Sequence, residues 1–188
     1  MKINGLILAA GNSSRLGQPK QLIQYQGRSL LTDIETKLLN CCDQIFVVLG
    51  YQPKLFKGEI NHAQIIENPT WQDGIGSSLV YGSKVATTNC TGLLIALTDQ
   101  PKITSSHYQQ LAKEFTPNPT KIIASAYQKR CGAPAIFPDC FFKELSQVDL
   151  RNGAQSVINQ HPDQVIKITC EAAADDIDTI EDVIKLNA

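Results

Sequence analysis

A loop of small and charged residues follows the first apolar run of the chain, and its residue types suit the binding of phosphate groups. The apolar run ends at Gly11, and Ser13, Ser14, Arg15 and Lys20 follow shortly after it. Glycine allows a ligand to approach the backbone closely, and successive backbone N–H groups in such a loop can form a nest that binds anions. The serine hydroxyls add donors, and the arginine and lysine supply positive charge. We therefore expect this loop to bind a polyphosphate.

Two known glycine-rich phosphate motifs do not fit the loop. The P-loop needs a closer pair of glycines with a lysine directly after the second one, whereas Gly11 and Gly17 are one residue too far apart and Lys20 is not adjacent to Gly17. The dinucleotide fingerprint needs glycine where Ser13 stands, which disfavours an oxidoreductase that uses it. An ordinary strand-to-helix turn with surface charges is the structural alternative, but it does not account for Arg15, Gly17 and Lys20 together.

A carboxylate stands at the end of another apolar run. The run over residues 93–98 leads directly into Asp99, and Pro101 follows. Open α/β sheets bind ligands at the carboxyl ends of their strands. Magnesium prefers one or two carboxylates together with phosphate oxygens. A turn residue before the proline is the alternative role of Asp99. In combination with the first loop, we expect Asp99 to hold a metal ion.

A third segment, which reads NPTWQDGIGSSL, combines glycines and serines at the expected start of a helix. Gly74, Gly76, Ser77 and Ser78 would offer N–H and hydroxyl donors at the helix N-terminus. Plain N-capping by serine is a compatible alternative. Trp71, the only tryptophan, is expected to serve packing rather than ligand binding.

The elements that must position these residues can be read from the alternation of short apolar runs with amphipathic stretches. Strands are predicted at residues 3–10, 44–50, 63–67, 92–98, 121–127, 133–137 and 164–169. Helices are predicted at residues 29–40, 75–86, 105–115, 153–160 and 179–187, the last with Thr179 and Asp182 in capping-box spacing. Such alternation predicts one domain over residues 1–188, an α/β fold arranged as a three-layer α/β/α sandwich with a mainly parallel sheet.

The overall composition excludes several classes of partner. Hydrophobic residues make up 43% and charged residues 19% of the chain, as in a globular protein with a core. The formal net charge is −1, so no global basic field exists to hold nucleic acid. No apolar stretch approaches the roughly 20 residues that cross a bilayer, and the N-terminal run is too short for a signal peptide. We therefore expect a cytoplasmic protein with no nucleic-acid or membrane partner.

The histidines and cysteines suggest no additional chemistry. His62, His107 and His161 are expected in polar, exposed surroundings, and none is paired with a serine or cysteine in a hydrolase motif. The six cysteines form no C-x-x-C pair and no zinc-site spacing, so they are expected to be reduced thiols. A redox-active pair at Cys41 and Cys42 is the alternative to a helix end or loop with no special role.

The first loop resembles a known family. The segment L-A-A-G-x-S-S-R-x-G-x-P-K is similar to the signature of the MobA-like NTP transferases, which include molybdenum cofactor cytidylyltransferase and guanylyltransferase. Similar openings occur in sugar-phosphate and methylerythritol-phosphate nucleotidyltransferases. The resemblance implies a Rossmann-like sheet of the nucleotide-diphospho-sugar transferase type. It also implies nucleotide binding by Leu8, Ala9, Ala10, Gly11, Ser13, Ser14, Arg15 and Lys20, with the backbone around residues 9–11 facing the base.

Other segments extend this likeness along the chain. The NPTWQDGIGSSL segment looks like the family's second substrate loop, which adds Gly76, Ser77 and Ser78 to the implied nucleotide-binding residues. Asp99 falls at the family's metal position, and Asp178 in DDIDTIED falls at its second metal position. The resemblance thus implies Mg²⁺, with Mn²⁺ as an alternative, on these two aspartates. Asp178 could instead only favour the positive end of the last helix.

Two segments near the expected acceptor are less informative. CGAPAIFP resembles a family segment in which Gly132 and Pro134 would fix a strand entry, and a purely structural role is equally consistent with it. LRNGAQSVI departs from the family pattern G-D-x-G-A-R, because Leu150, Arg151 and Gln155 replace its glycine, aspartate and arginine. The identity of the acceptor therefore stays open.

The resemblance implies an Mg-dependent nucleotidyltransferase that moves a nucleoside monophosphate from an NTP to a terminal phosphate on a small acceptor and releases pyrophosphate. Arg15, Lys20 and Asp99 are the implied catalytic residues. The GIGSSL loop and the DIDT tail favour CTP and molybdopterin over guanylyl transfer. A sugar-phosphate or other small-phosphate nucleotidyltransferase is the alternative. A third hypothesis is a non-catalytic carrier that binds nucleotide or molybdenum cofactor and delivers the cofactor to a partner molybdoenzyme.

Overall fold

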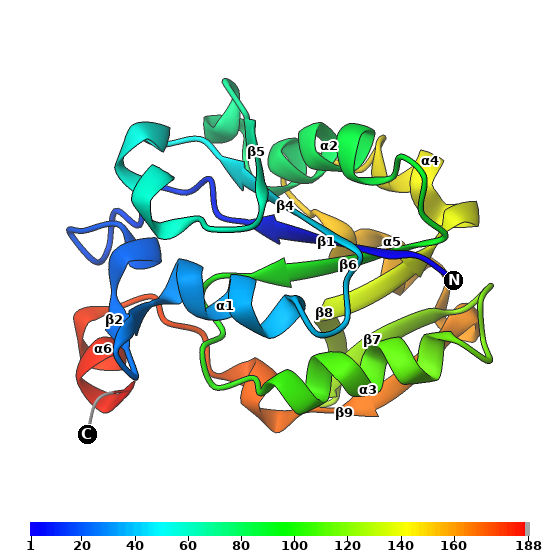
Figure 1. Cartoon of the computed structure of the whole chain (residues 1–188). Helices are drawn as coiled ribbons and strands as arrows, with labels where there is room; N and C mark the ends of the chain where they lie inside the picture. The colour runs from blue at the N-terminus through cyan, green and yellow to red at the C-terminus, as the bar shows by residue number, and fades with distance from the viewer. Residues whose placement is uncertain (187–188) are drawn as a thin grey trace.

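A seven-stranded sheet forms the centre of the molecule, in a computed structural model that describes residues 1–186 (Figure 1). The strands lie in the order β5-β4-β1-β6-β8-β7-β9. Their bounds are β1 Ile3–Leu8, β4 Gln44–Leu49, β5 Gln64–Glu67, β6 Gly92–Leu97, β7 Ile122–Tyr127, β8 Arg130–Pro138 and β9 Val165–Thr169. All the predicted strands are confirmed, and the sheet is mainly parallel as expected, with β8 antiparallel to both β6 and β7.

The β7–β8 hairpin makes β8 longer than predicted. Tyr127 pairs with Arg130, so β8 begins before the predicted residue 133. The two turn residues, Gln128 and Lys129, both have positive φ angles of 44° and 63°. Positive φ at both positions is the geometry of a type I′ turn, which matches the twist of an antiparallel pair. Neither residue is the glycine or asparagine that usually signals such a turn, and the sequence therefore gave no sign of it.

Helices cover both faces of the sheet (Figure 1). Their bounds are α1 Leu30–Leu38, α2 Ile75–Ala86, α3 Ser105–Phe115, α4 Phe142–Leu145, α5 Ala154–Gln160 and α6 Ile180–Leu186. The five predicted helices are present, and the short α4 is additional. The predicted end of the last helix, residue 187, lies outside the described residues. Among residues 1–186, no helix combines the length and apolarity that crossing a bilayer requires.

Alternate residues of each central strand feed two separate cores. On β1, Ile3 and Ile7 pack with α1 and α3, whereas Leu6 and Leu8 pack with Leu79 of α2. This alternation follows from the period of two along a strand. Because both faces are covered, the aliphatic runs are nearly continuous. The expected three-layer α/β/α arrangement is thus confirmed.

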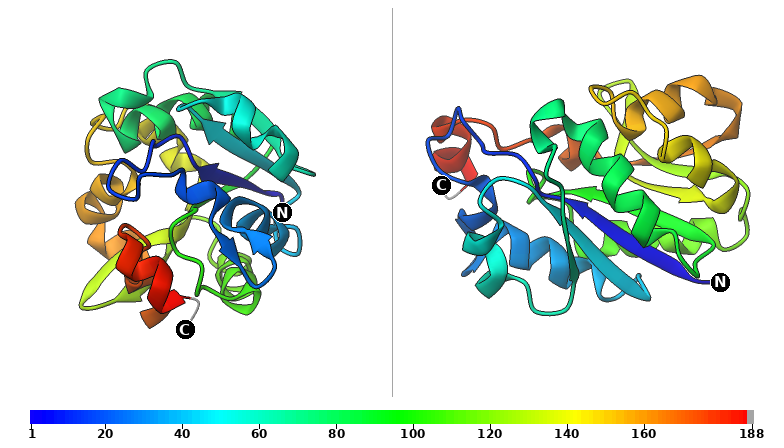
Figure 2. Two further views of the ribbon diagram at one scale, coloured as in Figure 1. Left: turned by 90° about the vertical axis from the view of Figure 1, so that its left-hand side faces the viewer. Right: turned by 90° about the horizontal axis from the view of Figure 1, so that it is seen from above.

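A third apolar cluster ties the end of the chain to its beginning. Leu16, Ile23, Leu30 and Ile177 are buried together, and α6 packs against them. Figure 2 shows α6 in red beside the blue N-terminal loop, at the edge where the parallel strands end. The small β2–β3 hairpin, Gln24–Tyr25 and Arg28–Ser29, adjoins this cluster. The cluster therefore holds the segment around Asp178 next to the loop that follows β1.

One expectation about a histidine is wrong. His107 on α3 is only 7% exposed, and its Nε2 lies 2.8 Å from the Ser125 hydroxyl. That hydroxyl donates to the carbonyl oxygen of Pro134 at 2.7 Å, so its proton is committed to the backbone. Burial lowers the pKa of His107. The histidine is a core residue. Its mostly polar sequence neighbours led to the prediction that it is exposed.

Candidate active site

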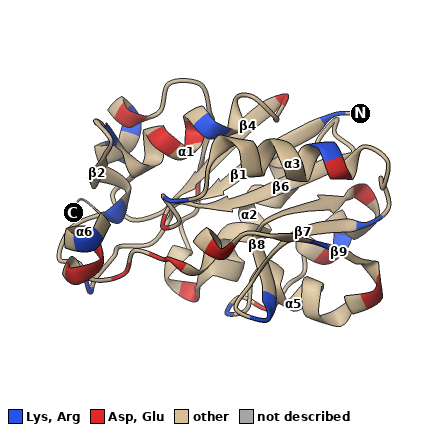
Figure 3. Cartoon of the chain, turned by 90° about the horizontal axis from the view of Figure 1, so that it is seen from below, with Lys and Arg blue, Asp and Glu red and all other residues tan. Residues whose placement is uncertain are grey.

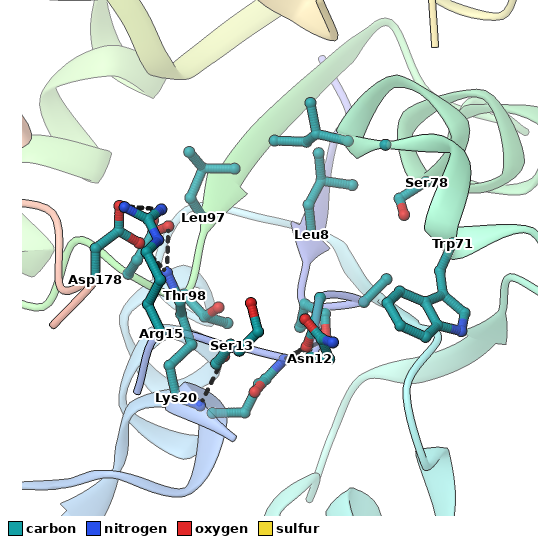
Figure 4. A pocket seen from close by; sticks show the side chains of 18 of the residues that line it. Leu8, Asn12, Ser13, Arg15, Lys20, Trp71, Ser78, Leu97, Thr98 and Asp178 are labelled. Carbon is teal, nitrogen blue, oxygen red and sulfur yellow. Dashed lines mark hydrogen bonds and ion pairs between the residues drawn. The ribbon is translucent and has the colours of Figure 1, made fainter. Parts of the chain in front are cut away.

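A cavity of about 350 Å³ lies at the carboxyl edge of the sheet, between the loops after β1 and β6 and the start of α2 (Figure 4). This is the edge at which open α/β sheets bind ligands. The lining residues are Leu8, Ala9, Ala10, Gly11, Asn12, Ser13, Ser14, Arg15, Lys20, Gln21, Trp71, Gln72, Gly74, Ile75, Ser78, Leu97, Thr98, Asp99 and Asp178. The structure thus brings together the whole predicted first loop, both predicted aspartates and Ser78.

Gly76 and Ser77 are the two predicted nucleotide-binding residues that do not line this cavity. The backbone N–H of Gly76 donates to the carbonyl oxygen of Leu150 at 2.8 Å, and a Cβ on this glycine would lie 2.7 Å from the Leu150 Cα. Ser77 is buried, and its hydroxyl donates to the Thr70 carbonyl oxygen at 2.9 Å. Both residues face protein, because the loop over residues 149–153 packs on Gly76 and the segment over residues 68–70 packs on Ser77.

Lys20 forms the centre of an ion cluster on the cavity wall. Its Nζ lies 3.1 Å from Asp99 Oδ2 and 2.8 Å from Asp178 Oδ1. Arg15 Nη2 lies 3.1 Å from the other oxygen of Asp178. Figure 4 shows Arg15, Lys20 and Asp178 pointing toward one another. The Lys20 side chain is only 15% exposed, so its charge is compensated mainly by these carboxylates rather than by water.

The cluster favours the charged forms of Lys20 and Asp178. Burial alone would lower the pKa of Lys20, but the charges and hydrogen bonds of Asp99 and Asp178 outweigh it and raise the pKa above its ordinary value. The hydrogen bond from Lys20 is the main reason that the pKa of Asp178 lies below its ordinary value, with the charges of Lys20 and Arg15 adding to it. The ammonium of Lys20 is therefore charged at neutral pH and can meet an anionic ligand.

Gln21 fixes the shape of the loop after β1. It is only 1% exposed, and its Nε2 donates to the carbonyl oxygen of Ala9 at 2.7 Å and to that of Gly11 at 3.1 Å. The backbone N–H of Tyr51 donates to the carbonyl oxygen of Ala10 at 3.0 Å. The protein itself therefore engages the carbonyl oxygens of the loop. Such a wall suits a ligand rich in hydrogen-bond acceptors, such as a polyphosphate.

A second contact closes the loop on Lys20. The Ser13 hydroxyl accepts a hydrogen bond of 3.0 Å from the backbone N–H of Lys20. Ser13 has a φ of 51°, in the left-handed region that L side chains seldom adopt. Strained backbone of this kind gathers at ligand-binding sites. The serine thus serves loop geometry through its side chain.

Asp99 and Asp178 have the chemistry of a divalent-cation site. Asp99 Oδ1 is buried and has no hydrogen-bond partner within the described part of the chain. Asp178 offers a second carboxylate on the other side of Lys20. No group of three or more histidine, cysteine or acidic side chains in residues 1–186 is arranged to hold a metal. Two carboxylates fit magnesium when substrate phosphates supply further oxygen ligands.

Several lining residues were missed by sequence reasoning. Asn12, Gln72 and Thr98 are neutral neighbours of predicted residues, and only their adjacency signalled them. Gln21 gave no sequence signal, because its bonds depend on the short 3₁₀ turn over Lys20–Leu22. Trp71 was expected to pack, and it does pack partly against the core, but it also lines the cavity.

Comparison with known proteins identifies the family of the chain. The model of the MobA-like NTP transferase domain matches residues 5–165. The fold and the site together define a nucleotidyltransferase of the MobA-like type. The chain belongs to the MobA-like NTP transferase family, as its first loop indicated.

The relatives of this chain carry the names of different activities. Nicotine blue oxidoreductase from Paenarthrobacter nicotinovorans is 32% identical over 98% of this chain and 96% of that protein. A probable molybdenum cofactor guanylyltransferase from Trichormus variabilis is 24% identical over 71% of this chain and 70% of that protein.

Solved structures confirm the fold. Rv0371c from Mycobacterium tuberculosis H37Rv aligns with a TM-score of 0.83 and 24% identity over 100% of both chains. A structure of that protein in complex with manganese aligns with a TM-score of 0.75 and 22% identity over 99% of this chain and 98% of that chain.

Substitution of Gln21 by leucine should destabilise the protein through the first loop. The change leaves the buried carbonyl oxygen of Ala9 without the donor that Gln21 supplies, and an unpaired buried polar group costs about 1–3 kcal/mol. We expect a loss of that size in the free energy of unfolding, measured by urea denaturation. Gln24→Leu is the matched control, because Gln24 is exposed and its side-chain amide donates to the carbonyl oxygen of its near neighbour Leu22. Equal stability of Gln21→Leu and the control would contradict this role.

The ion cluster should make stability fall in acid. The pKa of Asp178 is depressed below 3.8 in the folded state, so its contribution is present above that value and is lost as the pH falls through the folded pKa. Asp178→Asn should therefore destabilise the protein at about pH 7, and its effect in urea titrations should shrink as the pH falls below 3.8 toward about pH 2.

Asp175→Asn serves as the control for that titration. Asp175 pairs with Lys102 at 2.9 Å, but both side chains are largely exposed, and exposed pairs contribute little. Its substitution should change the unfolding free energy far less at either pH. An Asp178→Asn effect that is equally large at both pH values would rule out the depressed pKa as its source.

Proposed function

We propose that the protein transfers a nucleoside monophosphate from an NTP, with CTP as the preferred donor, to a terminal phosphate on a small acceptor. Molybdopterin is the proposed acceptor, and pyrophosphate is the leaving group. The observation that carries the proposal is the placement of Lys20 between Asp99 and Asp178, with Arg15 beside them, on the wall of a nucleotide-sized cavity. Residues 1–188 would act as one nucleotidyltransferase domain, and the expected cytoplasmic location stays a prediction.

The chemistry requires charge neutralisation more than proton transfer. A phosphate monoester has a second pKa of about 6, so the acceptor is largely dianionic at neutral pH and needs no general base. This agrees with the absence of histidine from the residues that line the cavity. Attack on the α-phosphorus builds charge on the leaving pyrophosphate, and the ammonium of Lys20 and the guanidinium of Arg15 are placed to stabilise it. Hydrogen bonds from the loop after β1 would hold the triphosphate for in-line attack.

A divalent cation, Mg²⁺ or alternatively Mn²⁺, would be held by Asp99 and Asp178. When bound, it would supply positive charge beside the phosphates and so stabilise the charge that develops on them. The unpartnered Oδ1 of Asp99 supports this assignment. The manganese complex of the mycobacterial relative supports a metal in the fold, although at 22% identity it shares only the architecture. Lys20 would then pass from the carboxylates to the phosphates as the ligand enters.

The identities of the base and of the acceptor are inferred from motif resemblance and from the names of relatives. The resemblance of the GIGSSL and DIDT segments favours CTP, whereas the relatives named guanylyltransferases favour GTP. The departures at Arg151 and Gln155 keep a sugar phosphate or another small phosphate open as acceptor. They also suit a non-catalytic carrier of nucleotide or molybdenum cofactor that serves a molybdoenzyme partner. Release of pyrophosphate separates the transferase from the carrier.

Reduction of a small substrate is a second candidate function. It is favoured by the relative that is named an oxidoreductase, which is 32% identical over 98% of this chain, whereas the guanylyltransferase from Trichormus variabilis is 24% identical over 71%. Its test is the oxidation of a reduced nicotinamide dinucleotide, followed by absorbance with a quinone-like acceptor. Pyrophosphate release from an NTP without such oxidation would favour nucleotidyl transfer.

Replacement of Asp99 by asparagine or of Lys20 by methionine should abolish most pyrophosphate release. Each change removes a preorganised charge, and losses of this kind cost about 10²–10³ in rate. A coupled pyrophosphate assay with CTP, Mg²⁺ and acceptor measures the effect. Lys102→Met is the matched control, because Lys102 is an exposed lysine outside the cavity lining that pairs with Asp175. Unchanged turnover in Asp99→Asn would refute the proposed site.

Binding of the preferred nucleotide should raise the melting temperature more than binding of the other nucleotides. A ligand that binds only the folded state stabilises it by about 2.7 kcal/mol at one hundred times its Kd. A thermal-shift screen of CTP, GTP, ATP and UTP with Mg²⁺ therefore reports base preference without knowledge of the acceptor. The largest shift is expected with CTP. A larger shift with GTP would reassign the donor to guanylyl transfer.

A further inference from the structure

The two ends of the cavity differ in chemistry. Arg15, Lys20 and Asp178 lie together on one side, and Trp71 lies on the other, with Leu8 between them (Figure 4). A nucleotide has the same asymmetry, because one end is a charged polyphosphate and the other is a flat aromatic base. The cavity therefore suggests an orientation for the ligand, with its charged end at the ion cluster and its ring at Trp71.

Trp71 is held in place rather than free to rotate away. Gly50 lies directly beneath it, and a Cβ at that position would come within 2.5 Å of the Trp71 Cγ. The ring of Tyr51 meets the indole edge-to-face, with centroids 5.7 Å apart and an interplanar angle of 72°. Tyr51 also donates its backbone N–H to the carbonyl oxygen of Ala10. The support of the indole is thus continuous with the loop that faces the phosphates.

We propose that Trp71 is a stacking platform for the nucleobase and that it sets the orientation and affinity of the nucleotide. The proposal rests on the proposed function, because it takes the cavity to be a nucleotide site. Stacking between a base and an aromatic ring contributes to affinity but tolerates any base, since every base has a π-face. Trp71 therefore does not choose the base, and choice falls to the polar groups near it, such as Ser78.

Packing alone is the simpler role for Trp71, and it makes a different prediction. The indole does contact the apolar core on the α2 side of the sheet. A tryptophan that serves only packing would matter for stability but would not respond to whether the ligand carries a ring. Ligands that share the polyphosphate and differ in the ring therefore separate the two roles.

The experiment uses the fact that Trp71 is the only tryptophan, so the intrinsic fluorescence of the protein reports this one side chain. The protein is titrated with CTP, with GTP and with inorganic tripolyphosphate, all with Mg²⁺, with excitation at the red edge of tryptophan absorption. Thermal shifts are recorded on the same samples. Both nucleotides should change the fluorescence, and tripolyphosphate should bind, as a thermal shift, without changing it.

Substitutions test the affinity directly. Trp71→Leu keeps an apolar side chain but removes the ring. It should lower the affinity for CTP about five- to a hundredfold and leave the affinity for tripolyphosphate unchanged. Trp71→Phe restores a ring and should recover most of the loss. Tyr81→Leu, which removes an exposed aromatic residue on α2 outside the cavity lining, is the matched control and should bind CTP normally.

The failures of the two proposals are distinguishable. If nucleotides raise the melting temperature but leave the fluorescence unchanged, the stacking role is wrong and the nucleotide site stands. If Trp71→Leu lowers the affinities for CTP and for tripolyphosphate equally, Trp71 has only a structural role. If neither nucleotides nor tripolyphosphate bind, the proposed function fails and the stacking role fails with it. Should Trp71→Leu not fold, the comparison of ligands on the unsubstituted protein still decides.

Discussion

The salt bridges that Lys20 makes with Asp99 and Asp178 are the interaction on which the site depends. They join three segments that are far apart in the sequence, and with Arg15 they form a cluster of two cations and two anions. A largely buried ammonium is tolerated only where such partners replace its water. Because the cluster is balanced, a triphosphate cannot enter as a bare anion without leaving negative charge in excess. A divalent cation that arrives with the phosphates restores the balance, and this links metal and nucleotide binding electrostatically.

Apolar packing, rather than the ions themselves, supplies the free energy that holds the cluster together. Leu16, Ile23, Leu30 and Ile177 bury the C-terminal segment against the N-terminal loop. The backbone N–H of Ile177 also donates to the carbonyl oxygen of Asp99 at 2.8 Å. Removal of apolar surface from water is favourable without regard to direction, whereas buried charges repay their desolvation only with good geometry. The hydrophobic cluster therefore brings the carboxylates into register, and the salt bridges then fix their orientation.

The elements of the fold and the charged half of the site could be predicted from sequence because their signals are local. Aliphatic runs mark the strands, and the glycine-rich loop and Asp99 stand at strand ends. The failures involve contacts between distant segments. Gly76 was predicted to bind the nucleotide, but in the folded chain the loop over residues 149–153 packs against it. The amide of Gln21 and the burial of His107 likewise depend on partners that only the folded chain brings near. Neutral residues that position a site leave little trace in the sequence.

Substrate choice in this family is expected to depend on the wall opposite the ion cluster. Relatives that share the fold are named for both guanylyl transfer and oxidoreduction, so the fold alone does not decide the chemistry. Here Gln155, where the family pattern has arginine, donates to the carbonyl oxygen of Cys131 at 2.6 Å and so ties α5 to β8. The adjacent loop, through Leu150, packs on Gly74 and Gly76 at the start of α2. Since Gly74 and Ile75 also line the cavity, a change in that loop alters the cavity wall without touching Lys20 or Asp99. The charged end of the cavity can thus stay constant while the wall opposite it varies.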